Sequence, residues 1–138
     1  RTRMAIARSG GREAITHYQV LETFAGRDGK PIACLVRCLL ETGRTHQIRV
    51  HMRAIGHPVV ADFMYSNHES CYVSDLLEKE RESGEVPIID RQALHAHRIE
   101  FFHPIQNRKM EFQADLPEDI SLLVKTLREV RPYKNGNN

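Results

Sequence analysis

The sequence has no long apolar run that could form a membrane-spanning helix. Its 138 residues nowhere approach the roughly 20 consecutive apolar residues that such a helix needs, so no membrane span is expected. The first residues are rich in arginine and carry no apolar stretch of the kind found in signal sequences. Because the chain begins with Arg1 rather than Met, we expect residue 1 not to be the natural start.

Cysteine is also scarce, and its spacing is uninformative for metal or redox chemistry. The three cysteines are an odd number and contain no CxxC pair, which argues against a disulfide framework and favours a reducing, cytoplasmic compartment. Cys34 and Cys38 lie in a predicted strand, where we expect them to be buried.

The composition is that of an ordinary globular domain, with 41% hydrophobic and 28% charged residues. A net charge of +2 hides an uneven distribution, since arginines cluster in 1–13 and 37–57 and acidic residues cluster in 69–90. Clustered arginine favours a polyanionic partner such as nucleic acid. Solvated charge runs would give the same pattern, so this observation is weak alone.

Two strands are predicted in the first third of the chain. Residues 14–24 are rich in β-branched and aromatic residues, and Asp28-Gly29 is a strong turn signal. In residues 32–41 apolar side chains occupy nearly every position, which predicts a central strand covered on both faces.

A short basic helix is predicted over residues 45–55. Its apolar side chains recur at helical spacing: Ile48, Met52 and Ile55. Thr45 is placed to cap the N-terminus, Gly56 to adopt the left-handed conformation after the helix, and Pro58 to prevent its continuation.

The second half of the chain predicts a polar insertion, a hairpin and a terminal helix. We interpret 66–90 as a surface insertion with one short helix over 74–83. Alternating residues around the Gln106-Asn107 turn predict a hairpin, and Pro117 opens a helix with an apolar stripe. The tail, 132–138, is expected to be disordered. The predicted fold class is α+β, with a mostly antiparallel sheet.

The segment most informative about function is LLETGRTHQIRVHMRAIGHPVVADFMY, at residues 39–65. It delivers the chain from a strand through a glycine turn into the basic helix. Polar hydrogen-bonding side chains crowd this helix and its start: Arg44, His46, Gln47, Arg49, His51 and Arg53. A helix N-terminus already favours anions, so an RNA phosphate backbone is one interpretation and a solvated helix face is the other.

The run TGRTHQIRVHM, followed by GHP and then by Asp62 and Tyr65, closely resembles the third signature motif of RluA-type RNA pseudouridine synthases. GREAITHYQVLETF upstream, and RQALHAHRIEFFHP and FQADLPEDI downstream, resemble the segments that flank this motif in the family. The resemblance covers residues 11–131. It implies that 1–131 is the C-terminal part of a catalytic domain whose N-terminal half is its partner.

The resemblance implies an activity that this chain cannot complete alone. Members of the family convert uridine in structured RNA to pseudouridine without metal or organic cofactor, detaching the uracil, turning it and rejoining it through carbon. Their nucleophilic aspartate lies upstream in an HRLD-type signature, as does a tyrosine that stacks on the base. The chain contains no such signature. We therefore expect ribosomal RNA as the substrate of the full-length enzyme and no activity in this fragment.

The family's arginine that pairs with the nucleophile corresponds to Arg49. A guanidinium keeps a neighbouring carboxylate ionised and oriented, which a nucleophile requires. Arg49 should be partly buried, and its charge would stay unpaired unless water or another carboxylate entered. The remaining basic-helix residues are assigned to RNA contact or to support of the motif turn: Arg44, His46, Gln47, His51 and Arg53.

This sequence departs from the family pattern at two places. Ala61-Asp62 stands where a glycine-aspartate pair is common, which we interpret as a minor change. The insertion at 66–90 replaces a shorter stretch and leaves the choice of RNA open.

Competing readings are a metal site and a non-catalytic RNA-binding module. The eight histidines form no known ligand motif, and His95 and His97 fit ordinary sheet positions better. The module would bind RNA through helix 45–55 and have no nucleophile. The length of the motif match favours the truncated enzyme over the module. Four aspartates remain candidate surrogate nucleophiles, although each lies in a turn or loop without the motif context: Asp28, Asp62, Asp90 and Asp115.

Overall fold

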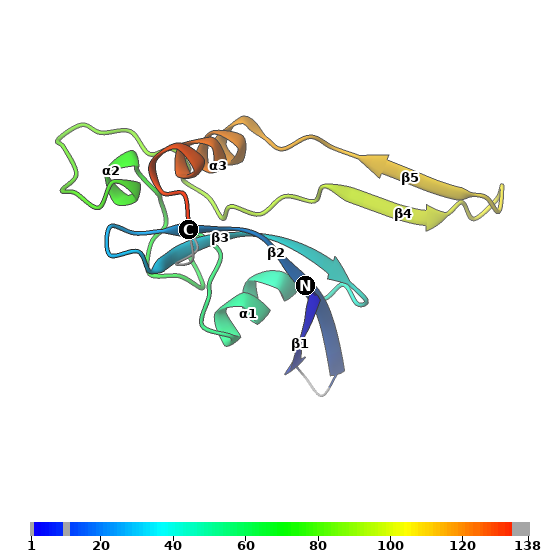
Figure 1. The fold of residues 1–138 in the computed structure, drawn as a ribbon. Helices are drawn as coiled ribbons and strands as arrows, with labels where there is room; N and C mark the ends of the chain where they lie inside the picture. The colour runs from blue at the N-terminus through cyan, green and yellow to red at the C-terminus, as the bar shows by residue number, and fades with distance from the viewer. Residues whose placement is uncertain (1, 10–11, 134–138) are drawn as a thin grey trace.

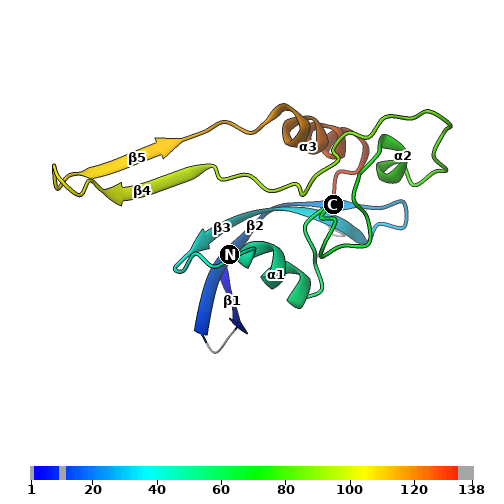
Figure 2. The same ribbon diagram turned by 180° about the vertical axis from the view of Figure 1, so that it is seen from behind.

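The computed structural model describes residues 2–9 and 12–133. A twisted antiparallel sheet lies in the middle, formed by β1 (Thr2–Ser9), β2 (Arg12–Ala25) and β3 (Pro31–Leu40) in that order. Helix α1 (Gln47–Ala54) lies on one side of this sheet, and α2 (Val73–Leu76) and α3 (Glu118–Val130) lie on the other (Figures 1 and 2). The α+β class and the antiparallel sheet are confirmed.

The β2–β3 turn forms as the Asp28-Gly29 pair predicts. Gly29 has a φ of 81°, in the left-handed region that glycine enters without steric cost, and its N–H donates to Gly26 O at 3.0 Å. The side chain of Asp28 also stabilises the turn, because its Oδ1 accepts a hydrogen bond from Lys30 N at 2.9 Å.

A bulge at Leu21 divides β2 into two halves that serve opposite faces of the sheet. Val20 pairs with Val36 and Glu22 with Leu35, so Leu21 is the extra residue. One inserted residue reverses the alternation of side chains along a strand. Thr16 therefore faces α1, whereas Phe24, also even-numbered, is buried in the core on the α3 side.

The main core lies between the second half of β2 and α3. It combines the stripe of α3 with side chains from β2 and the connecting segments: Phe24, Ala61, Cys71, Leu76, Ile89, Ile120, Leu123, Val124 and Leu127. The C-terminal helix and its buried stripe are confirmed. The segment 66–90 was expected at the surface, but three of its apolar residues, Cys71, Leu76 and Ile89, are buried in this core, where they are removed from water.

The structure corrects three details of the local predictions. The expected helix 74–83 is only the single turn of α2, because the polar residues that follow have no apolar stripe to bury and Glu78 adopts a φ of 55°. The expected disorder of the tail is wrong at its start, since Pro132 bridges to Phe24 in antiparallel fashion. Residues 134–138 lie outside the described residues.

Strand β3 is not the central, doubly covered strand that its composition predicts. It pairs only with β2 among the described strands, and Leu39 is 66% exposed. Cys34 is exposed and Cys38 half-buried, so the expected burial of both is wrong for Cys34. The sequence pattern correctly predicts that both faces of this strand are apolar. It does not predict whether other parts of the described chain cover those faces.

The predicted second hairpin is confirmed as β4 (Arg98–Phe102) and β5 (Lys109–Gln113), which extend away from the other elements (Figure 1). Its aromatic residues are exposed, including Phe102 at 68% and Phe112 at 52%. No helix in the described ranges is long and apolar enough to cross a membrane.

Candidate RNA-modification site

A buried ion pair between Arg49 and Asp62 lies at the centre of the motif. The Arg49 side chain leaves the middle of α1 and meets the loop that follows the helix. Nε donates to Asp62 Oδ2 and Nη2 donates to Oδ1, both at 2.7 Å. Arg49 is 6% exposed and Asp62 is fully buried, so the two charges face each other out of water in the side-on geometry that suits a guanidinium.

The carboxylate of Asp62 is held from its own loop as well. The backbone N–H groups of Met64 and Tyr65 donate to Oδ1 at 3.1 and 3.2 Å. Hydrogen bonds from Arg49, and then from these two amides, hold the pKa of Asp62 below its ordinary value against the opposing effect of burial. In turn, Asp62 raises the pKa of Arg49, so both groups stay ionised.

The charge of Arg49 is therefore paired within this chain, which is the outcome expected if another carboxylate entered the site. That carboxylate is Asp62, which lies 13 residues further along the sequence. This ion pair also argues against Asp62 as a surrogate nucleophile, because both of its oxygens are occupied and no part of it reaches the surface.

Two aromatic rings flank the guanidinium, and a histidine contacts one of them. The Arg49 Cζ lies 5.7 Å from the centre of the Phe63 ring and 5.2 Å from that of Tyr65, within cation-π range. The Tyr65 hydroxyl forms a 3.0 Å hydrogen bond with His46 Nδ1. Tyr65 therefore links the guanidinium to the start of α1, where His46 adopts a left-handed φ of 53°.

Gln47 and His51 form a second buried network between α1 and β2. Gln47 Nε2 donates to Thr16 Oγ1 at 3.0 Å, and the same hydroxyl lies 2.7 Å from His51 Nδ1. Gln47 Oε1 accepts from Thr42 Oγ1 at 2.9 Å, within the motif turn. Burial lowers the pKa of His51, which favours its neutral form.

These contacts give Gln47 and His51 a structural role. Gln47 is 4% exposed and His51 is 2% exposed, so neither side chain is presented to a partner in this structure. Of the two roles considered from the sequence, support of the motif turn fits both residues. No sequence pattern predicts Thr16 as their partner. Threonine is common in strands, and its contact with α1 forms only in the tertiary structure.

Arg44 and Arg53 are exposed, and His46 is half-buried. Within the described residues, neither arginine side chain forms a hydrogen bond or ion pair, so both remain available to phosphates. The predicted helix is confirmed, but Thr45 does not cap it: the capping position is His46, without a side-chain bond. The C-terminal end matches the prediction, since Gly56 has a φ of 83° and donates to Arg53 O at 2.9 Å.

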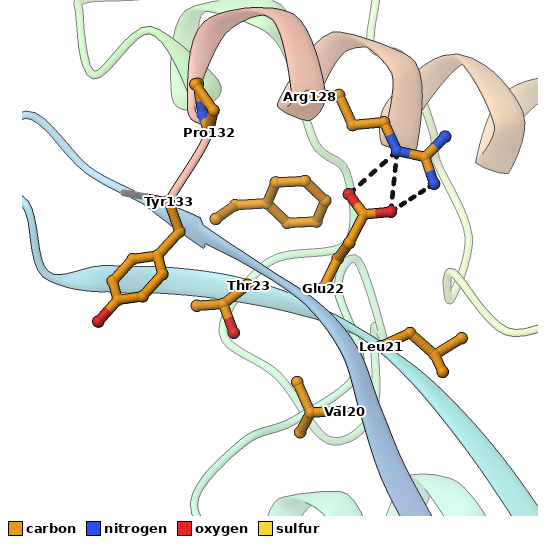
Figure 3. A pocket seen from close by; sticks show the side chains of 8 residues that line it. Val20, Leu21, Glu22, Thr23, Arg128, Pro132 and Tyr133 are labelled. Carbon is orange, nitrogen blue, oxygen red and sulfur yellow. Dashed lines mark hydrogen bonds and ion pairs between the residues drawn. The ribbon is translucent and has the colours of Figure 1, made fainter. Parts of the chain in front are cut away.

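A shallow cleft of about 450 Å³ lies elsewhere, between β2 and the end of α3 (Figure 3). Glu22 and Arg128 form an ion pair at one side of it, with Arg128 Nε 3.0 Å from Glu22 Oε1, and Tyr133 lies at the other. None of the residues that the sequence assigned to RNA lines this cleft. No group of three or more histidine, cysteine or acidic side chains among the described residues is arranged to hold a metal ion.

Comparison with known proteins shows which proteins this chain is similar to. Residues 1–54 match the model of a family described as RNA pseudouridylate synthase. The fold is similar to that of the human RNA pseudouridylate synthase domain containing 1, with a TM-score of 0.50 and 26% sequence identity, over 97% of this chain and 61% of that chain. The resemblance to pseudouridine synthases inferred from the motif is confirmed.

Curated relatives narrow the resemblance further. The chain is 41% identical over 128 residues to the ribosomal large subunit pseudouridine synthase D of Neisseria meningitidis serogroup B, covering 93% of this chain and 31% of the relative. It is 37% identical over 135 residues to the protein of the same name in Escherichia coli K12, covering 93% and 36%. The chain therefore spans about a third of the length of the curated relatives it matches.

Proposed function

We propose that residues 1–131 form the C-terminal part of the catalytic domain of an RNA pseudouridine synthase. The full-length protein would act in the cytoplasm and convert uridine to pseudouridine in ribosomal RNA. The observation that carries this proposal is the buried Arg49, held rigidly in the middle of a motif that resembles the family's. A simple phosphate contact would not require an arginine at 6% exposure.

Arg49 is the proposed partner of a nucleophilic aspartate supplied by the N-terminal half of the domain. Its Nε and Nη2 are engaged by Asp62, whereas Nη1 donates to no acceptor among the described residues. A carboxylate that approached Nη1 would be kept ionised and oriented, as a nucleophile must be.

The exposed apolar surface supports an N-terminal half as partner. Leu39 on β3, and Phe102 and Phe112 on the hairpin, are more than half exposed, at 66%, 68% and 52%. Side chains of this kind on sheet elements usually meet another layer of the same domain. We propose that the missing part of the catalytic domain packs on β3 and on the hairpin.

Tritium release from RNA that carries 5-tritiated uridine tests the proposed activity. The full-length protein should release tritium and convert uridine to pseudouridine, while the fragment 1–138 should release none. Turnover by the fragment alone would show that the nucleophile lies within it. Absence of turnover by the full-length protein on its ribosomal RNA would contradict the proposal.

A non-catalytic RNA-binding module is the second candidate, and the exposed Arg44 and Arg53 favour it. Both proposals predict salt-dependent RNA binding with a slope of roughly 0.7 to 0.9 per phosphate contacted. Arg53→Ala should weaken binding and reduce this slope, whereas Arg27→Ala removes the same charge from the exposed β2–β3 turn and should leave it unchanged. The module alone predicts binding without turnover in the full-length protein.

A further inference from the structure

The loop that follows α1 encloses the guanidinium of Arg49 more completely than an ion pair requires. Asp62 occupies two nitrogens with bonds of 2.7 Å, and the next residues of the loop return to the same site. Met64 N and Tyr65 N fix the carboxylate, while the rings of Phe63 and Tyr65 flank the guanidinium. One short segment, 62–65, therefore restrains both the position and the rotation of Arg49.

The backbone of this loop is itself specialised for that purpose. Ala61, immediately before Asp62, is 3% exposed and has a φ of 59°, in the left-handed region that a residue with a Cβ rarely adopts. A strained residue persists only where its surroundings hold it in place. Here the strain turns the chain so that the carboxylate of Asp62 reaches Nε and Nη2 of Arg49.

We propose that Asp62 is a positioning residue for Arg49, holding two guanidinium nitrogens so that the third, Nη1, remains available to the nucleophilic carboxylate. The inference rests on the proposed function, because it assigns a role to Asp62 within that reaction. Asp62 does not contact the substrate or the reacting atoms. It acts through Arg49, since a guanidinium bound side-on along one edge presents its remaining nitrogen in one direction.

The test is a comparison of single-turnover rates in the full-length protein at saturating enzyme. Asp62→Asn keeps the side-chain shape but removes the charge and one of the two acceptors for Arg49. We expect the rate to fall by about tenfold to a hundredfold, while the dissociation constant for RNA changes by less than about threefold. An unchanged rate in a folded Asp62→Asn protein would overturn the inference.

A control pair joins α3 to the segment before β4. Arg91 and Asp119 form a second side-on pair, with Nε to Oδ2 and Nη2 to Oδ1 both at 2.9 Å, remote from the motif in sequence. Asp119→Asn breaks a pair of the same geometry, although this pair is more exposed than that of Arg49, and should leave the single-turnover rate within about twofold of wild type. An equal loss of rate in both variants would show that Asp62 serves stability alone.

A double-mutant cycle distinguishes positioning from a general structural effect. If Asp62 acts through Arg49, then adding Asp62→Asn to the Arg49→Ala protein should lower the rate by less than about twofold further. Multiplicative losses would contradict the proposal. If Asp62→Asn does not fold, NMR of the Arg49 guanidinium in the wild-type protein provides the test. Slow rotation about the Nε–Cζ bond is expected, and free rotation would overturn the positioning role of Asp62.

These outcomes separate this inference from the proposed function. A wild-type full-length protein that does not form pseudouridine would overturn both. An active wild type whose rate is insensitive to Asp62→Asn would overturn the positioning role alone and leave the proposed function in place.

Discussion

The two faces of the central sheet are packed by opposite means. On the α3 face, the core is apolar and includes Phe24, Leu123 and Leu127. On the α1 face, Thr16, Gln47 and His51 are buried and joined by hydrogen bonds, and Arg49 of the same helix forms a buried ion pair with Asp62. Apolar packing tolerates many sequences of similar volume, whereas a buried polar network functions only when every member has its partner.

This difference suggests that the α3 face mainly stabilises the fold, whereas the polar groups of the α1 face serve the proposed chemistry. Burial of charge is costly, and replacing a buried ion pair by apolar residues often stabilises a protein. The buried pair of Arg49 in α1 and Asp62 in the following loop is therefore better explained by a requirement other than stability. Four predictions sharpen this comparison between the α1 face and the α3 face.

The largest effect is expected at Arg49. In the full-length protein, Arg49→Ala should lower the single-turnover rate by about a hundredfold or more, because the proposed nucleophile loses its charge partner. Affinity for RNA should change far less. Arg49→Lys should restore little activity, since an ammonium cannot make the two-pronged contact of a guanidinium. Tritium release at saturating enzyme measures the rate, and loss of affinity with an unchanged rate would make Arg49 a phosphate contact only.

The α3 face should show the reverse pattern. Leu123→Ala leaves a cavity in the core that includes Phe24 and should lower the free energy of unfolding by about 2 to 5 kcal/mol, with little change in single-turnover rate while the protein stays folded. Leu122→Ala is the control on the same helix, because Leu122 is 51% exposed and should cost less than about 1 kcal/mol. Denaturant unfolding measures both. Equal losses would contradict the burial difference between neighbouring positions.

The polar network predicts a pH dependence. Burial lowers the pKa of His51 in the folded protein. Below pH 6.5, the ordinary pKa of histidine, the unfolded chain therefore binds a proton at this residue that the folded protein does not bind. The stabilisation is complete above about pH 6.5 and is lost as the pH falls toward the lowered folded pKa, by at most about 1.4 kcal/mol per pH unit.

Unfolding free energies of wild type and His51→Gln, measured between pH 7.5 and 5, isolate this contribution. The wild type should lose more stability than the variant over that range. Parallel curves would show that His51 takes up its proton equally in both states, which would contradict its buried, neutral state.

The smallest effect is expected at Ala61, where opposing terms nearly cancel. Ala61→Gly relieves a left-handed backbone by about 1 kcal/mol or more. The same substitution removes a buried methyl group, which destabilises the folded state by about 0.8 kcal/mol. It also increases the conformational entropy of the unfolded chain, which lowers the stability by about 0.4 to 1 kcal/mol. The net change in unfolding free energy should stay within about 1 kcal/mol, and a larger loss would mean that the backbone at Ala61 is unstrained.

Local patterns predicted the elements that are specified within a few residues. The turn at Asp28-Gly29, the basic helix with Gly56 after it, and the apolar stripe of α3 are all present, because each depends on neighbours in sequence. Strand β1 was not predicted. Its pairing with β2 is what defines it as a strand, and its residues had been interpreted as a basic stretch.

What the sequence by itself determined about this protein is its motif and therefore its family resemblance, together with Arg49 as the residue on which the proposed chemistry depends. Only the tertiary structure decided what surrounds that residue. Asp62 as its partner, Thr16 beneath His51, and the exposure of β3 are all contacts between segments that loops bring together. Periodicity predicts which side chains are buried. It does not predict which residues they contact, because those contacts form only when distant segments pack together.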